Sequence, residues 1–351
     1  MTHHDVIVLG GGAAGLSAAL ALGRARRRVL VLDEGRPRNR FAAHMHTVLG
    51  HEGLDPAELL ERGRAEVARY GVEVRPGRAV EVRDTGETDV RLRVVTHEGE
   101  ELATRALVLA TGLTDHLPNV PGLAERWGTR VLHCPYCHGW EVRGERLAVL
   151  LTSPAGLHQA ELVRQWSDDL TVLAGEVEVP ALAAARLASR GVQIVSGKLT
   201  SVEDSADGGL AVRTAAGAVH LVDAIFLASR AVPNDGALAG LDLERAELPG
   251  GQGSFLAVDP TGRTSHERIW AAGNVTSPAL GVAASAGAGT IAGGMANMAL
   301  VAAEFDAAER ALALLGVGLG AGQWVPLFQL VRSNFREGAA SLPGPGADRA
   351  C

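Results

Sequence analysis

DVIVLGGGAAGLSAALAL, residues 5–22, decides how this chain begins to fold. The apolar run at 5–9 predicts a strand, the glycine-rich run a tight turn, and the alanine- and leucine-rich end a helix. Strand, glycine turn and helix in this order are the context that a dinucleotide-binding fingerprint requires. Gly10 permits the turn, Gly12 lets the backbone approach a pyrophosphate, and Gly15 allows close packing of helix on strand. A glycine-rich turn without a ligand is the less favoured alternative.

A second strand at 29–32 ends in Asp33, at the distance expected for a carboxylate that bonds ribose hydroxyls. The same layout returns about 140 residues later, with a strand at 146–151 and a helix at 157–167. The turn between them, Thr152-Ser153-Pro154-Ala155-Gly156, lacks at least two of the glycines that a nucleotide-binding version needs. The sequence therefore predicts an α/β chain with two Rossmann-like domains, the second keeping the fold without a well-formed phosphate site.

Cys134-Pro135-Tyr136-Cys137 places two of the three cysteines two residues apart. A pair at this spacing can close and reopen a small disulfide, so it predicts redox chemistry rather than a structural cross-link. Zinc is the alternative, but four ligands are needed, and His133 and His138 would crowd adjacent residues onto one ion. We therefore predict no metal site. Three further histidines are interpreted as loop residues near a cofactor edge or in solvent: His44, His46 and His51.

Charge and composition exclude several classes of function. Lys and Arg number 33 against 40 Asp and Glu, and the net charge of −7 argues against a nucleic-acid surface. The first strand begins by residue 5, so we expect no signal peptide, and three cysteines cannot all pair, which favours a reducing cytoplasm. The uncharged stretch 275–303 contains Pro278 and Asn297 among many Gly and Ala residues, so we expect a buried helix and no membrane span.

Breaks in these patterns predict the domain boundaries. The apolar strand at 106–112 is followed by Pro118, Pro121 and Gly122, which mark a crossing into the second unit. After a glycine-rich linker, five apolar residues at helical spacing predict one more helix, followed by a Pro/Gly-rich mobile tail from Ser341: Trp324, Leu327, Phe328, Val331 and Phe335. The predicted domains are 1–117 with 248–316, then 118–247, and a C-terminal extension at 317–351 that ends in an incidental cysteine, Cys351.

Together these features resemble the low-molecular-weight thioredoxin reductase family of flavoproteins, over about residues 4–310. The resemblance lies in the first glycine turn, the strand end Ala110-Thr111-Gly112, the CxxC, and Ala272-Gly273-Asn274, where the family has a Gly-Asp pair. The run HCPYCHGWE at 133–141, with Pro154 and 158–160, is similar to one subgroup. That subgroup comprises the dithiol oxidases that close disulfides in natural products such as gliotoxin, holomycin and romidepsin.

The resemblance implies that FAD binds in the first domain, into which the second domain is inserted. Asn274 keeps an acceptor oxygen but lacks the charge of the family's acidic residue, so weaker FAD binding is expected. A helix N-terminus around 283–286 would stabilise negative charge on the reduced flavin. The resemblance assigns these residues to FAD: Gly10, Gly12, Ala13, Ala14, Gly15, Asp33, Glu34, Arg38, Asn39, Thr111, Gly112, Gly273, Asn274, Ala283 and Ala284.

The second domain suggests the direction of electron flow. Its strand ends in Ala174-Gly175-Glu176, where NADPH-using relatives carry a basic cluster, and a carboxylate there would repel the 2′-phosphate. NADPH is therefore a doubtful cofactor, and NADH has no better support. We expect a dithiol substrate to attack the disulfide at Cys134, with Cys137 facing the flavin by resemblance and O2 as the acceptor, giving H2O2.

His138 stands next to Cys137, where thioredoxin reductases have an acidic residue that handles protons. A histidine titrates in the range needed to take a thiol proton, so His138 is the third predicted catalytic residue, with His133 a weaker candidate. The partners expected are a small-molecule dithiol, O2 and, by family resemblance, a second copy of the chain. Two alternatives remain: an NAD(P)H-dependent thioredoxin or disulfide reductase, and a flavin-bound protein without enzymatic activity.

Overall fold

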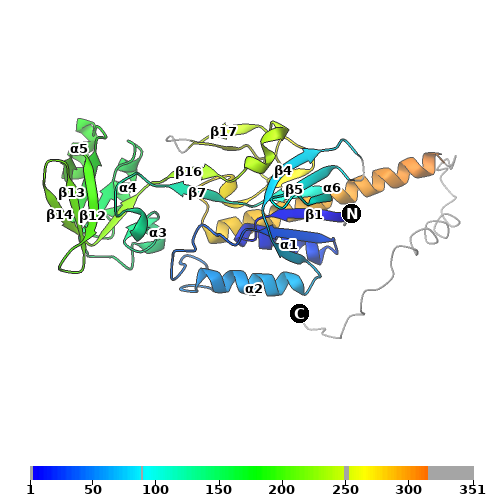
Figure 1. The fold of residues 1–351 in the computed structure, drawn as a ribbon, viewed down its shortest axis with the longest axis horizontal. Helices are drawn as coiled ribbons and strands as arrows, with labels where there is room; N and C mark the ends of the chain where they lie inside the picture. The colour runs from blue at the N-terminus through cyan, green and yellow to red at the C-terminus, as the bar shows by residue number, and fades with distance from the viewer. Residues whose placement is uncertain (1–2, 88–89, 249–252, 315–351) are drawn as a thin grey trace. The chain divides into compact units, whose positions relative to one another are not determined.

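The computed structural model describes residues 3–87, 90–248 and 253–314 (Figure 1). The predicted C-terminal extension, with its helix, its tail and Cys351, lies outside these residues.

The first sheet is built mainly from the N-terminal third of the chain. Its strand order is β3-β2-β1-β6-β5-β4, with β19 paired to β6. Strands β3, β2, β1, β6 and β19 run parallel, whereas β5 and β4 add an antiparallel edge. The bounds are β1 His3–Leu9, β2 Val29–Asp33, β3 Glu73–Pro76, β4 Ala79–Asp84, β5 Leu92–Thr96, β6 Glu101–Leu109 and β19 Ile269–Ala271.

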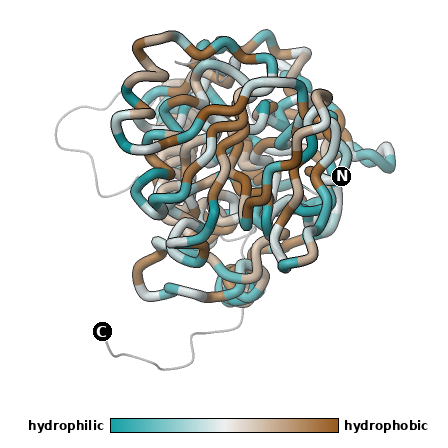
Figure 2. Tube along the Cα trace, turned by 90° about the vertical axis from the view of Figure 1, so that its left-hand side faces the viewer, coloured by the Kyte–Doolittle hydropathy of each residue, from teal (hydrophilic) through white to brown (hydrophobic). Residues whose placement is uncertain are grey.

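The central strands of this sheet are apolar on both faces because helices and loops cover both. Val6 and Val8 pack into one core cluster, while Ile7 and Leu9 pack into another on the opposite face. Figure 2 views the chain from the left-hand side of Figure 1, with the second unit in front, and there too strands at the centre of the trace are coloured as hydrophobic. A near-continuous apolar run is typical of a parallel strand that is buried on both sides.

Three helices accompany the first sheet: α1 Ala13–Arg24, α2 Pro56–Ala68 and α6 Val282–Leu314. Helix α6 packs on α1 through glycine, since a Cβ on Gly289 would lie 1.9 Å from the carbonyl oxygen of Ala14. The prediction of a buried helix at 275–303 is correct for one face only. The helix begins at Val282, and its buried positions recur every three to four residues: Ser285, Gly289, Ala292, Gly293, Ala296 and Leu300.

Among the described helices, α6 alone is long and apolar enough to cross a membrane. That is weak evidence, because a core helix of a soluble protein passes the same test. Ala292, Ala296 and Leu300 belong to the core cluster that contains α1 and β1, so this helix is a packing element of the first sheet.

The second sheet repeats the layout of the first. Its order is β11-β10-β9-β15-β8, and all of these strands run parallel. The predicted two Rossmann-like units are therefore confirmed, the second lying within the sequence of the first. The bounds are β8 Val131–Leu132, β9 Leu147–Leu150, α4 Gly156–Val163, β10 Leu170–Gly175, α5 Ala181–Ala188, β11 Gln193–Ser196 and β15 Ala224–Leu227, with an antiparallel sheet of β12 Leu199–Asp204, β13 Leu210–Thr214 and β14 Val219–Val222.

Two short antiparallel strands connect the sequence segments of the two sheets. The chain passes through β7 Leu113–His116 after the first sheet's β6, and returns through β16 Arg230–Pro233 after the second sheet's β15. The domain boundaries proposed from the sequence, near 117 and 247, stay predictions. The remaining elements are α3 Pro135–His138, β17 Arg245–Glu247, β18 Ser254–Leu256 and the 3-10 helices η1 Ala124–Arg126, η2 Gly236–Leu241 and η4 Gly273–Val275.

Candidate active site

Four parallel strands of the first sheet end at the same level. Leu9 of β1 pairs with Leu32 of β2 and with Leu109 of β6, which in turn pairs with Ala271 of β19. Ligands of open α/β sheets bind beyond the carboxyl ends of the strands. The predicted cofactor residues follow these four ends, so the structure brings together Gly10–Gly15, Asp33–Glu34, Thr111–Gly112 and Gly273–Asn274.

The three glycines of the first turn serve different purposes. A Cβ on Gly10, whose φ is +100°, would lie 2.4 Å from the carbonyl oxygen of Ala110. A Cβ on Gly15 would lie 1.8 Å from the carbonyl oxygen of Gly10. By contrast, a Cβ on Gly12 would have no protein atom within 4 Å. The fold itself excludes side chains at Gly10 and Gly15, whereas Gly12 faces open space where a ligand would fit.

The N-terminus of α1 offers free amide donors at this open space. Gly12 caps the helix in extended conformation, no side chain bonds to the cap, and the first turn contains no acidic residue. The first helical hydrogen bond runs from the amide of Leu16 to the carbonyl of Gly12, at 2.9 Å. The amides before Leu16 have no intrahelical acceptor, and together with the helix dipole they suit a pyrophosphate.

Asp33 lies over the glycine turn. Its Oδ1 accepts hydrogen bonds from the amides of Gly11 (3.1 Å) and Gly35 (3.2 Å), which fixes the carboxylate. Beside it, Glu34 lies 4.0 Å from Arg78. An open pocket of about 360 Å³ extends from here, lined by Asp33, Glu34, Pro76, Gly77, Arg78, His97 and Glu98. In the predicted FAD site, Asp33 would bond the ribose hydroxyls of the adenosine end.

The turn Thr111–Gly112 is tied to Asn234, a residue that the sequence did not single out. Thr111 Oγ1 donates to the carbonyl of Asn234 at 2.7 Å, and Asn234 Nδ2 donates back to the carbonyl of Thr111 at 3.1 Å. The amide of Asn234 also donates to the carbonyl of Gly112 at 3.0 Å. Asn234 therefore holds the strand end that borders the glycine turn, and an asparagine after β16 carries no local signal of that role.

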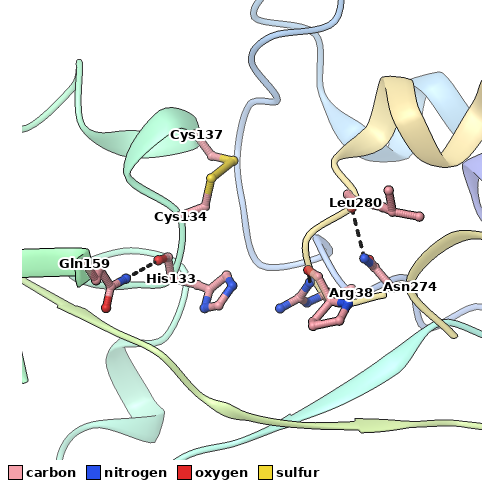
Figure 3. The surroundings of a disulfide bond; sticks show 8 residues. Arg38, His133, Cys134, Cys137, Gln159, Asn274 and Leu280 are labelled. Carbon is pink, nitrogen blue, oxygen red and sulfur yellow. Dashed lines mark hydrogen bonds between the residues drawn. A yellow bond between two sulfur atoms is a disulfide. The ribbon is translucent and has the colours of Figure 1, made fainter. Parts of the chain in front are cut away.

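Asn274 closes the loop that leads into α6. Its Nδ2 donates to the carbonyls of Ser277 and Leu280, both at 2.9 Å, and Figure 3 shows the bond to Leu280. An aspartate could not donate these bonds, so the loop explains why an amide stands where the family has an acidic residue. The loop places the first turn of α6, with Ala283 and Ala284 exposed, after Gly273.

Arg38 links three separate segments. Its Nε and Nη2 donate to Asp115 on β7, each at 2.8 Å, and its Nη1 donates to the carbonyl of Pro278 at 2.9 Å. Ser229 donates a further bond to Asp115 at 2.5 Å. Burial alone would raise the pKa of Asp115, but the hydrogen bonds and charge of Arg38 hold it below the usual range.

Arg38 and Asn39 were both predicted to contact FAD. The guanidinium of Arg38 is bonded to the protein, and the carbonyl of Asn39 accepts from the amide of Ala42 at 3.1 Å. Their contact with the cofactor stays a prediction. The sequence missed Asp115 and Ser229, because Asp115 bonds to Arg38 and Ser229 bonds to Asp115, and each of these partners is far away along the chain.

Cys134 and Cys137 form a disulfide in the second unit, with their Cα atoms 5.3 Å apart (Figure 3). Cys134 has extended backbone before the short helix α3, and Pro135 occupies the first helical position. The amide of Cys137 donates to the carbonyl of Cys134 at 3.1 Å, so one turn brings the two sulfurs together. A Cβ on Gly139 would lie 2.7 Å from the ring of Trp166, so this end of the turn is closely packed.

The two histidines that flank the disulfide are poorly solvated. Nδ1 of His133 and Nδ1 of His138 are buried and have no hydrogen-bond partner among the described residues. Burial lowers the pKa of both imidazoles. At His133 the charge of Arg38 lowers it further while Asp115 opposes this, and in Figure 3 the ring of His133 points toward Arg38. Both rings are therefore suited to be neutral near pH 7, the form that accepts a proton.

Gln159 on α4 fixes the backbone just before the disulfide, since its Nε2 donates to the carbonyl of His133 at 2.7 Å. Of the loop histidines, His44 contacts the carbonyl of Gly53 at 3.1 Å, whereas His46 contacts Glu52 at 2.6 Å and Glu141, in the segment after the disulfide, at 3.5 Å. Across the described residues there is no group of three or more His, Cys, Asp or Glu side chains that could hold a metal ion.

The turn of the second unit differs from the first in its hydrogen bonds. The amides of residues 156–158 donate to the carbonyls of residues 153–155, at 3.0 to 3.3 Å. Ala155, the residue before α4, has helical backbone, whereas Gly12 before α1 is extended. The first amides of α4 are therefore already occupied by the preceding turn.

Comparison with known proteins gives a family. The family described as pyridine nucleotide-disulphide oxidoreductase matches residues 4–289. Thioredoxin reductase tcpT of Claviceps purpurea is 31% identical over 312 residues, which cover 85% of this chain and 94% of that protein. Thioredoxin reductase sirT of Leptosphaeria maculans is 36% identical over 190 residues, which cover 50% of this chain and 57% of that protein.

Two solved structures are similar over nearly their whole length. The crystal structure of HlmI is 42% identical with a TM-score of 0.84, and the match covers 89% of this chain and 97% of that one. An oxidoreductase from Agrobacterium tumefaciens is 34% identical with a TM-score of 0.79, covering 86% of this chain and 99% of that one.

Proposed function

This chain belongs to the pyridine nucleotide-disulphide oxidoreductase family, and within it we propose an FAD-dependent dithiol oxidase that closes a disulfide in a small-molecule natural product. It is a thiol–disulfide oxidoreductase, and the disulfide Cys134–Cys137 is the redox pair of the proposal. The direction of electron flow is inferred from the turn at 152–156, because the amides of residues 156–158 already donate to backbone carbonyls and are not free for a pyrophosphate. The dithiol substrate and the O2 acceptor rest on the resemblance of the run 133–141 to the dithiol oxidases.

The occupied turn argues against a nicotinamide donor. A dinucleotide pyrophosphate needs free amides at the helix N-terminus, as at Gly12 of the first turn. At the second turn those amides already bond to backbone carbonyls, and Glu176 after β10 is exposed where a 2′-phosphate would be recognised. Electrons then have to come from the thiols of the substrate.

The first step is attack of a substrate thiolate on Sγ of Cys134. A bond forms between the two sulfurs, the Cys134–Cys137 bond breaks, and its electron pair leaves on Cys137 as a thiolate. His138 takes the proton of the attacking thiol, since its buried imidazole has a lowered pKa and is neutral near pH 7.

The second step releases the product. The other substrate thiol, deprotonated in turn, attacks the substrate sulfur of the mixed disulfide, and the electron pair of that bond leaves on Cys134. The substrate has then lost two electrons and two protons. The reduced Cys134–Cys137 pair must then lose two electrons to close again. FAD, which Gly10–Gly15 and Asn274 would hold, would supply the two-electron acceptor for this, and with O2 as the final acceptor one H2O2 would balance each disulfide formed.

A second candidate function is an NAD(P)H-dependent disulfide reductase. The relatives named thioredoxin reductase favour it, because the same fold and cysteine pair can work in either direction. The homodimer and the cytoplasmic location are carried forward as predictions with either function.

Oxygen uptake separates the two candidates. The purified FAD-loaded protein is mixed with dithiothreitol in air, with and without NADPH, while oxygen and flavin absorbance are followed. We expect dithiol-driven oxygen uptake that NADPH neither replaces nor increases, and its loss in Cys137→Ser. Cys351→Ser is the matched control, since it removes the third cysteine and should keep full uptake. Anaerobic bleaching by NADPH alone, without dithiol-driven uptake, would establish the reductase instead.

A further inference from the structure

His46 joins the loop between β2 and α2 to the segment that follows the disulfide. Its Nδ1 lies 2.6 Å from Oε1 of Glu52, and its Nε2 lies 3.5 Å from Oε1 of Glu141. Glu52 is itself fixed, because its Oε2 accepts from the amide of Thr47 at 2.9 Å. Thr47 has a φ of +62°, so the backbone adopts a rare conformation in the residue next to His46.

Both ring nitrogens of His46 therefore face carboxylate oxygens. A neutral imidazole has one donor and one acceptor nitrogen, so it can satisfy only one of these contacts. The imidazolium donates from both nitrogens and matches both carboxylates. The imidazole is 21% exposed, and the two carboxylates, at 64% and 46%, are more exposed, so the cluster is in contact with solvent.

The cluster borders the predicted base of the reaction. Glu141 stands three residues after His138, and its negative charge raises the pKa of His138, while the positive charge of His46 lowers it. His133 stands on the other side of the disulfide, and a charge on His138 would lower the pKa of His133. His46 itself faces Glu52 on its own loop and Glu141 on the disulfide segment.

We propose that His46 is a positioning residue of the disulfide site: as an imidazolium it pairs with Glu141 and offsets that charge, which keeps His138 neutral and ready to take the thiol proton. The proposal rests on the proposed function, in which His138 is the base. Burial is the largest cause of the lowered pKa of His138, and an unpaired Glu141 carboxylate would oppose it, because a nearby negative charge favours the charged imidazole.

The test measures how fast dithiothreitol reduces Cys134–Cys137 between pH 5 and 8, by quenching with an alkylating reagent and counting modified cysteines. In His46→Gln, Glu141 is unopposed, so more of His138 is protonated. We expect the rate on the acidic limb of the profile to fall about twofold to fivefold, the effect of a partly exposed charge pair. Glu141→Gln should raise the rate on that limb by a similar factor, and the double variant should return toward the wild-type profile.

His44→Gln is the matched control, because His44 belongs to the same loop and contacts only a backbone carbonyl there. Glu52→Gln is the second variant. It keeps the imidazole of His46 but removes one of the two carboxylates that favour the charged imidazole. At acidic pH it should lower the rate of disulfide reduction less than His46→Gln does. Proton NMR titration of the His138 ring in each variant gives a readout that needs neither FAD nor turnover.

The proposal is overturned if His46→Gln and His44→Gln give the same pH profile of the reduction rate, or if Glu141→Gln shifts the His138 titration in the same direction as His46→Gln. The NMR result stands even if dithiol-driven oxygen uptake is absent, so failure of the proposed function is seen separately.

Discussion

Replacing Gly12 and Gly15 in turn by alanine separates ligand binding from folding at the first turn. Both positions lie in the same six-residue turn, but a Cβ on Gly12 would meet no protein atom within 4 Å, whereas a Cβ on Gly15 would lie 1.8 Å from the carbonyl oxygen of Gly10. The first substitution intrudes only on the space in front of the helix N-terminus. The second forces the turn and α1 apart.

The expected magnitudes follow from these distances. For Gly12→Ala, the loss of a favourable N-cap residue costs about 0.5–1 kcal/mol, and the reduced freedom of the unfolded chain returns about 0.4–1 kcal/mol, so the free energy of unfolding should change by less than about 1 kcal/mol. For Gly15→Ala, a contact of 1.8 Å with backbone cannot be relieved by a side-chain rotation. We expect a loss of about 3 kcal/mol or more.

The assay uses protein from which the flavin has been removed, so that ligand and fold are measured apart. Urea unfolding followed by tryptophan fluorescence gives the stability, and titration with FAD gives the affinity. Gly12→Ala should unfold like the wild type yet bind FAD at least about tenfold more weakly, a change of about 1.4 kcal/mol. Wild-type FAD affinity in Gly12→Ala would refute the assignment of this open space to the pyrophosphate, and wild-type stability in Gly15→Ala would refute the packing argument.

Three further predictions concern residues around the disulfide and the FAD site. Asn274→Asp should lower the melting temperature and fail to tighten FAD binding in a titration, because a carboxylate faces two carbonyl oxygens and leaves them unpaired, at about 1–3 kcal/mol. Asp115→Asn should lower the free energy of urea unfolding by about 3 kcal/mol, since it leaves the guanidinium of Arg38 without its carboxylate; an unchanged value would contradict the buried pair. His133→Gln should flatten the pH dependence of stability below pH 6.5. In the wild type, the unfolded chain takes up a proton at His133 near pH 6.5, whereas the folded chain, in which the pKa of His133 is lowered, does not. The free energy of unfolding therefore falls as the pH drops below 6.5. Equal slopes of the free energy of unfolding against pH in both proteins would exclude this account.

The sequence was sufficient for the features that depend on local pattern. Gly10–Gly15 and Asp33 were recognised from one strand–turn–helix–strand unit, and the parallel register then places them at one edge with Thr111 and Asn274. Short apolar runs that are buried on both faces predict parallel strands, and they did so in both units.

What the sequence did not give are contacts between distant segments. Asp115, Ser229 and Asn234 stand on or beside the two connecting strands, where no periodicity or motif distinguishes them from ordinary surface polar residues. The pairing of His46 with Glu141 is of the same kind, since the two residues are 95 positions apart in the sequence. The start of α6 at Val282 agrees with the helix N-terminus expected around 283–286. The uncharged stretch itself begins earlier, at Val275, and Asn274 holds the residues after it in a loop.

The two Rossmann units show how one architecture can offer or withhold an anion site. Before α1 the backbone is extended at Gly12 and the first amides of the helix are free; before α4 it is helical at Ala155, and three amides already bond to backbone carbonyls. A pyrophosphate would have to replace those three hydrogen bonds, each of which contributes about 1 kcal/mol. Binding of a pyrophosphate at the second turn should therefore be weaker than at the first by about 3 kcal/mol, or roughly a hundredfold in affinity. The exposed carboxylate of Glu176 adds repulsion toward a 2′-phosphate. Because this penalty lies in the backbone conformation of the turn, a single glycine substitution would not remove it.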